Sequence, residues 1–196
     1  MGLKKLKTSY SGVLSIFSRY WRSYGGIGAL LVSPYFHLSL LLSVGMTPFW
    51  LNKSWWDTAL STLPNLLGFT LAGFTIWLGF GDEKFRNLIS KSKPEKESPF
   101  MGVSAAFAHF VVIQLLALLA ALWALAMNFP TPDWISANCF SEFLIASGHF
   151  FGFFLFVYSL MSTLAATMGV FRAASWYDSY KKKSDLPAAN SSDSAP

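Results

Sequence analysis

The chain has 196 residues, of which 53% are hydrophobic and only 13% are charged, and its mean hydropathy is +0.42. A typical soluble domain carries about 25% charged residues, and a soluble core of this length would hardly bury nineteen Phe and eight Trp, so the composition argues against a soluble protein. The formal charge of +5 would suggest nucleic acid binding, but in a membrane protein the charge must first be assigned to the two sides of the bilayer. The single cysteine, Cys139, excludes an internal disulfide and any multi-cysteine metal site.

The segment ahead of the first long apolar run is amphipathic. From Tyr10 to Tyr24, apolar residues recur at helical spacing, with Arg19 and Arg22 between them, and Gly25-Gly26 follows. This pattern predicts an interfacial helix on the inner leaflet that ends at the glycine pair. The basic residues of the first seven positions would add attraction to anionic lipid. We assign residues 1–26 to a cytoplasmic N-terminus that carries this helix.

Four stretches are long and apolar enough to cross a bilayer as helices, which takes about 20 residues. They contain no Asp, Glu, Lys or Arg, and they are 27–51, 59–81, 101–129 and 143–171. Pro34 and Pro48 lie towards the two ends of the first stretch and Pro64 lies inside the second, where each allows a kink. The sequence thus predicts an all-α membrane protein with four transmembrane helices over 27–171. A cytoplasmic tail, 172–196, follows and should be disordered at its end.

Basic residues set the predicted orientation. Fourteen of the fifteen Lys and Arg precede the first span, lie between the second and third, or follow the fourth, and Lys53 is the exception. Because such an excess marks the cytoplasmic side, we expect a multi-pass protein of a bacterial inner membrane with both termini in the cytoplasm. All eight Trp lie near span ends, as expected of two interfacial belts.

Small residues repeat at helical spacing along two of the spans, and these faces predict close helix packing. The positions are Gly68, Ala72, Thr75 and Gly79 in the second span, and Gly148 and Gly152 in the fourth, which form a G-x-x-x-G motif. Packing inside the bundle is the preferred explanation for one face. The other would be free for self-association, so we expect a homo-oligomer.

Polar residues inside the spans are the candidates for function, because ionisable groups in a bilayer are costly. A proton or ion path would involve His37, Asn65, His109 and Gln114. A structural role, with neutral histidines hydrogen-bonded between helices, is the preferred alternative. Three histidines without carboxylates make a poor metal site, so we predict no metal and no cofactor.

The second span and its exit, 64–74 followed by 79–85, resemble a phrase found in small uncharacterised bacterial membrane proteins. Some proteins of that kind belong to anti-phage defence operons, including the four-span membrane subunit of the Kiwa system. The resemblance covers this part of the chain alone, and no site carries over from it.

Motifs of enzyme active sites are absent from the sequence: there is no Walker loop, nucleophile elbow, H-E-x-x-H or C-x-x-C. We therefore expect a non-enzymatic membrane protein that acts as sensor, anchor or effector with a cytoplasmic protein partner. We expect no direct nucleic acid binding. The alternative is a channel or small transporter that uses the intramembrane His and Asn residues.

Overall fold

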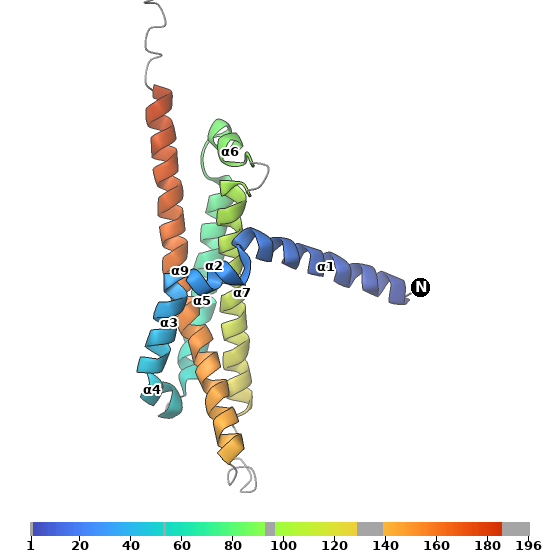
Figure 1. The fold of residues 1–196 in the computed structure, drawn as a ribbon, viewed down its shortest axis with the longest axis vertical. Helices are drawn as coiled ribbons and strands as arrows, with labels where there is room; N and C mark the ends of the chain where they lie inside the picture. The colour runs from blue at the N-terminus through green and yellow to red at the C-terminus, as the bar shows by residue number, and fades with distance from the viewer. Residues whose placement is uncertain (1, 53, 93–96, 129–138, 186–196) are drawn as a thin grey trace, which may run out of the picture.

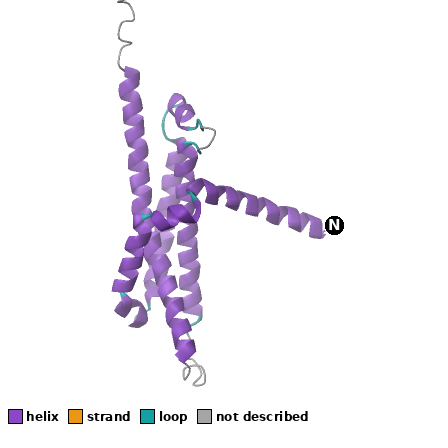
Figure 2. Cartoon of the chain, viewed as in Figure 1, coloured by secondary structure: helices purple, strands orange, loops and turns teal. Residues whose placement is uncertain are grey.

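The computed structural model describes residues 2–52, 54–92, 97–128 and 139–185, and all its regular elements are helices (Figure 2). In chain order they are α1 (Gly2–Tyr24), α2 (Gly26–Val32), α3 (Pro34–Gly45), α4 (Thr47–Asn52), α5 (Trp55–Gly79), α6 (Glu83–Ile89), α7 (Pro99–Ala126) and α9 (Cys139–Asp185). Residues 129–138, between the third and fourth predicted spans, and the end of the tail, 186–196, for which disorder is predicted, lie outside the described residues.

Three helices are long and apolar enough to cross a membrane, namely α5, α7 and α9, and the bent pair α2–α3 would make a fourth span. The three long helices lie along the vertical axis of the molecule (Figure 1). The prediction of an all-α, multi-pass membrane protein is therefore confirmed.

The first predicted span, 27–51, is not one continuous helix. It is divided into α2, α3 and α4, and the axes of α2 and α3 differ by 58°. The bend falls at Ser33, which has extended backbone because a residue before proline is sterically pushed out of the helical region, and Pro34 then starts α3. A proline near the end of this stretch thus produces a true break.

Helix α1 confirms the predicted amphipathic segment and extends it towards the N-terminus. It ends where predicted, because Gly25 and Gly26 adopt positive φ angles of 104° and 64° that other residues rarely adopt. Figure 1 shows α1 (dark blue) projecting from the side of the bundle, across its long axis. Such a direction suits a helix that lies in the plane of a membrane surface.

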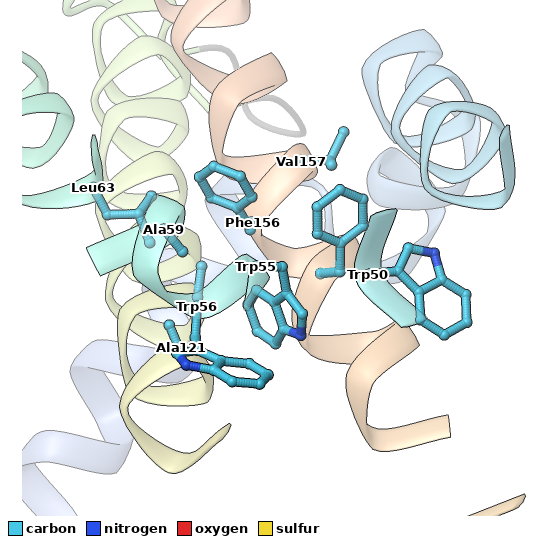
Figure 3. Packing of buried hydrophobic residues seen from close by; sticks show 10 residues of the cluster. Trp50, Trp55, Trp56, Ala59, Leu63, Ala121, Phe156 and Val157 are labelled. Atoms are coloured by element: carbon cyan, nitrogen blue, oxygen red, sulfur yellow. The ribbon is translucent and has the colours of Figure 1, made fainter. Parts of the chain in front are cut away.

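The bundle holds two buried hydrophobic clusters. One lies around the start of α5 and contains Trp50, Trp55 and Trp56, packed with α7 and α9 (Figure 3). The other lies around the end of α5 and contains Trp77 and Phe85. All four tryptophans are at most 8% exposed, so they pack inside the protein and do not face lipid as an interfacial belt would require. Among the tryptophans that the structure describes, only Trp123 is mostly exposed, at 68%.

A short helix, α6, follows α5 after a break that was not predicted from the sequence. Gly81 has a φ of 81°, and the Asp82 side chain then caps α6 by accepting a hydrogen bond of 2.8 Å from the Phe85 N–H. The Lys181 ammonium of α9 lies 3.3 Å from the same carboxylate. Helix α9 itself continues as one helix well beyond the predicted span, to Asp185.

The cap and ion pair at Asp82 predict a pH dependence. The Phe85 N–H, and after it Lys181, lower the pKa of Asp82 below its ordinary value near 3.8. A carboxyl group whose pKa is lower in the folded state contributes stability above its unfolded pKa, and this contribution is lost as the pH falls through the folded pKa. We expect the protection of the α6 amides from hydrogen exchange, relative to the intrinsic rate at each pH, to fall below about pH 4. The Asp82→Asn variant should lack that acid step, and an identical pH profile in both proteins would contradict the assignment.

Candidate functional site: a histidine and tyrosine network

His109 lies in α7 and is 1% exposed, with both ring nitrogens in hydrogen bonds. The Tyr20 hydroxyl of α1 is 2.9 Å from Nδ1, and the Tyr158 hydroxyl of α9 is 3.1 Å from Nε2. The Tyr24 ring stacks on the imidazole at 3.9 Å between centroids and 16° between planes. We call these four residues the His109 network.

The hydrogen-bond donors and acceptors of the His109 imidazole match those of the two tyrosine hydroxyls. A neutral imidazole has one N–H donor and one bare nitrogen acceptor, so it can donate to one tyrosine hydroxyl and accept from the other. Burial, helped by neighbouring Tyr24, raises the pKa of Tyr20 to about 12, so this hydroxyl keeps its proton at neutral pH. Every polar atom of the imidazole therefore has a partner, as a buried polar group requires.

The network joins three elements that are far apart in the sequence. Tyr20 and Tyr24 belong to the last two turns of α1, and they reach the bundle because the chain turns back at Gly25 and Gly26. They lie four residues apart, so both side chains fall on one face of α1. The α1 helix is thus held to α7 and α9 by its C-terminal end, whereas its N-terminal part projects outward (Figure 1).

A second polar pair lies deeper in the bundle. The Gln114 Nε2 amide donates a hydrogen bond of 2.9 Å to Thr70 Oγ1 on α5, and Thr70 in turn donates to the Leu66 carbonyl at 3.0 Å. Gln114 is 1% exposed, and its Oε1 has no hydrogen-bond partner among the described residues. A buried acceptor that stays unpaired costs free energy.

The four residues of the predicted polar path do not come together in the described chain. His109 and Gln114 are buried on α7, but His37 on α3 and Asn65 on α5 are exposed on the outside of the bundle. Among the described residues, no three His, Cys, Asp or Glu side chains lie close enough to hold a metal ion.

The predicted packing residues also divide into two groups. Gly152 is buried, and a Cβ added there would lie 2.7 Å from the Trp55 ring. The remaining five are exposed: Gly68, Ala72, Thr75, Gly79 and Gly148. A Cβ added at any of the three glycines in this exposed group would meet no heavy atom within 4 Å, so the small-residue face of α5 is open within the part of the chain that the structure describes.

Sequence reasoning missed the three tyrosines of the His109 network. It placed Tyr20 and Tyr24 on the apolar face of a surface helix and did not consider Tyr158. One signal in the sequence could have indicated the network. A histidine inside a span is costly unless it is hydrogen bonded, and two tyrosines four residues apart on the amphipathic helix could supply the hydroxyl groups. Comparisons with protein-family models, curated proteins and solved structures find no match for this chain.

Proposed function

We propose that the chain is a non-enzymatic sensor in a bacterial inner membrane, with both termini in the cytoplasm. In this proposal α1 responds to the inner leaflet, and the bundle passes the response to a cytoplasmic protein partner. The observation that carries it is the His109 network, since it connects the projecting α1 to α7 and, through His109, to α9.

The surface of α1 supports contact with lipid. Its apolar face carries Val13, Leu14 and Phe17, all more than 50% exposed, so this face has no cover within the described chain. Arg19 and Arg22 lie on the same helix. An amphipathic helix of this kind gains free energy by placing its apolar face in the headgroup region and its cations near anionic lipid.

The length of α9 supports transmission to the cytoplasm. Tyr158 is linked to α1 through the His109 network. After Tyr158, another 27 residues of α9 follow up to Asp185, a rise of about 40 Å. A displacement of α1 would therefore change the environment of Tyr158 on a continuous rod that leaves the membrane. The partner would bind near the end of this rod, where Lys181, Lys182 and Lys183 lie.

Lipid charge is expected to change the position of the end of α9. Spin labels at Asn87→Cys on α6 and Ser179→Cys on α9, with Cys139→Ser, would report the distance between the two helices by pulsed electron resonance. We expect the distance distribution to shift between zwitterionic liposomes and liposomes rich in phosphatidylglycerol. Replacing Lys4, Lys5 and Lys7 with Gln should suppress the shift, because each cation near the surface contributes about 1 kcal/mol. Identical distributions in both membranes would exclude this form of sensing.

Self-association through α5 is the second part of the proposal. The exposed face of α5 carries Gly68, Ala72, Thr75 and Gly79, which would let another backbone approach closely. Asn65 is exposed one turn before Gly68, about 15 Å along α5 from Trp55, and its amide makes no hydrogen bond to the described residues. A second copy would supply partners for this amide, which lipid tails lack.

The combined substitution Gly68→Leu and Ala72→Leu is expected to convert the oligomer into monomer without unfolding the chain. Both positions face outward, so the added side chains block a second helix and clash with nothing inside the chain. Mass photometry in nanodiscs would measure the assembly, with Val44→Phe on the exposed side of α3 as the control. An unchanged mass in the double variant, or a monomeric wild type, would refute the interface.

The biological setting that we propose is phage defence, on the resemblance of 64–74 and 79–85 to proteins of such operons. A nuclease or DNA-binding gene beside this one would favour that setting. A transport gene would favour the alternative function.

A channel is the alternative, and the unpaired Gln114 Oε1 is the observation that favours it. A buried acceptor without a protein partner is often satisfied by water, and a chain of waters conducts protons or ions. Flux assays in liposomes distinguish the two functions. Flux that disappears in Gln114→Leu would support the channel, and absence of flux under any gradient would support the sensor.

A further inference from the structure

A groove of about 550 Å³ lies between α7 and α9 at the end of the bundle away from α1. Its walls are apolar and include Trp123, Leu144 and Phe151, each more than 60% exposed. Gly148 and Gly152 also line the α9 side, and a Cβ added at Gly148 would meet no heavy atom within 4 Å. The groove therefore has the shape and lining of a site for a long apolar group.

His149 is the polar exception in this lining. The Trp55 Nε1–H donates a hydrogen bond of 3.1 Å to His149 Nδ1, and the Trp56 ring stacks on the imidazole with centroids 5.6 Å apart. An indole N–H can only donate, so Nδ1 must be the bare nitrogen of a neutral ring and Nε2 must carry the proton. Trp55 and Trp56 thereby fix both the tautomer and the orientation of His149.

The Nε2–H of His149 has no acceptor among the described residues. In an apolar surrounding an unmade hydrogen bond of this kind costs free energy, so the groove favours an occupant that brings an acceptor. The occupant must combine that acceptor with an apolar chain.

The depth of the site indicates which acceptor the membrane supplies. A Cβ at Gly152 would lie 3.7 Å from the Ala120 Cβ, and α7 ends six residues later at Ala126, a rise of about 9 Å. The His149 side chain leans towards the N-terminus of α9, and so towards the membrane surface. The ester carbonyls of phospholipids lie at this boundary between hydrocarbon and headgroups, and each is joined to an acyl chain.

We infer that the groove between α7 and α9 is a phospholipid site in which His149 Nε2 donates a hydrogen bond to an ester carbonyl and the acyl chain lies along Gly148 and Gly152. The leaflet is the one opposite α1. The site is independent of the proposed sensor function and of the α5 interface.

Two photoactivatable lipids test this assignment on the wild-type protein in liposomes. One is a diester phosphatidylcholine with a diazirine in its acyl chain, and the other is its diether analogue, which lacks the carbonyls. We expect the diester to label Trp123 and Phe151 about fivefold more than the diether, as expected for one net hydrogen bond. Labelling of Phe69 and Ile76, exposed on α5, should be equal for both lipids and serves as the internal control.

Two variants separate the donor from the groove. In His149→Asn the amide oxygen can still accept from Trp55, but no donor reaches the Nε2 position, so the diester preference should disappear. Gly148→Leu fills open space and should reduce labelling of Trp123 and Phe151 by both lipids. A diester to diether ratio near one at these residues in the wild type would overturn the proposal. Protection of the groove from both lipids would overturn it as well and would indicate a second copy of the chain there.

Discussion

Replacing His109 with Leu is expected to release α1 from the bundle while the membrane spans stay assembled. The substitution leaves an apolar side chain of similar volume, but it removes the partners of the Tyr20 and Tyr158 hydroxyls. It also removes the ring on which Tyr24 stacks. Unpaired buried hydroxyls make the docked position less favourable by about 2 kcal/mol. Because α1 is held by its last two turns, this loss should populate undocked positions substantially.

The position of α1 can be measured with spin labels at Ile16→Cys on α1 and Leu119→Cys on α7, in a Cys139→Ser background. Both labelled sites are exposed, so neither label perturbs the core. We expect one narrow distance distribution for the otherwise unaltered protein and a broad one for His109→Leu. His37→Leu is the matched control, because His37 is an exposed histidine in another helix and its loss should leave α1 in place. A narrow, unshifted distribution in His109→Leu would show that other contacts hold α1.

Long apolar runs allowed three of the four predicted spans to be placed from the sequence. In α5, α7 and α9, an uncharged stretch of sufficient length has only one favourable conformation in a bilayer, because a helix satisfies every backbone hydrogen bond internally. The glycine pair that ends α1 could also be predicted, since a helix end depends on local backbone chemistry. The first span showed its prolines but not how far Pro34 would bend it.

The faces of the spans were much harder to predict. In a soluble helix the apolar stripe marks the buried side, but a span is apolar on all sides, so its pattern does not distinguish the core from lipid. His37 and His109 thus looked equivalent, although one is exposed and the other is held by three tyrosines. Likewise Trp50 and Trp77 lie near span ends, where an interfacial role seemed natural, but they pack in the core.

The two glycines of the G-x-x-x-G motif are expected to respond oppositely to alanine, with a large loss of stability at Gly152. A Cβ there would lie 2.7 Å from Cζ2 and Cη2 of Trp55, a contact that real side chains do not tolerate. The indole cannot move aside easily, because it is fully buried, it donates to His149, and it packs edge-to-face on Phe153. Overpacking of this kind costs about 1–3 kcal/mol.

Gly148 lies one turn away on the same helix and is the natural control. A Cβ at this position meets no heavy atom within 4 Å, so Gly148→Ala has no clash and should keep the stability of the parent chain or gain from the better helix propensity of alanine. Unfolding in bicelles with increasing sodium dodecyl sulfate, followed by tryptophan fluorescence, would compare the two variants. Because the backbone effect of Gly→Ala is common to both, the difference between their unfolding free energies isolates the contact with Trp55. Equal stability of Gly148→Ala and Gly152→Ala would mean that the Trp55 ring is free to shift, and the rigid α5–α9 contact described above would then be wrong.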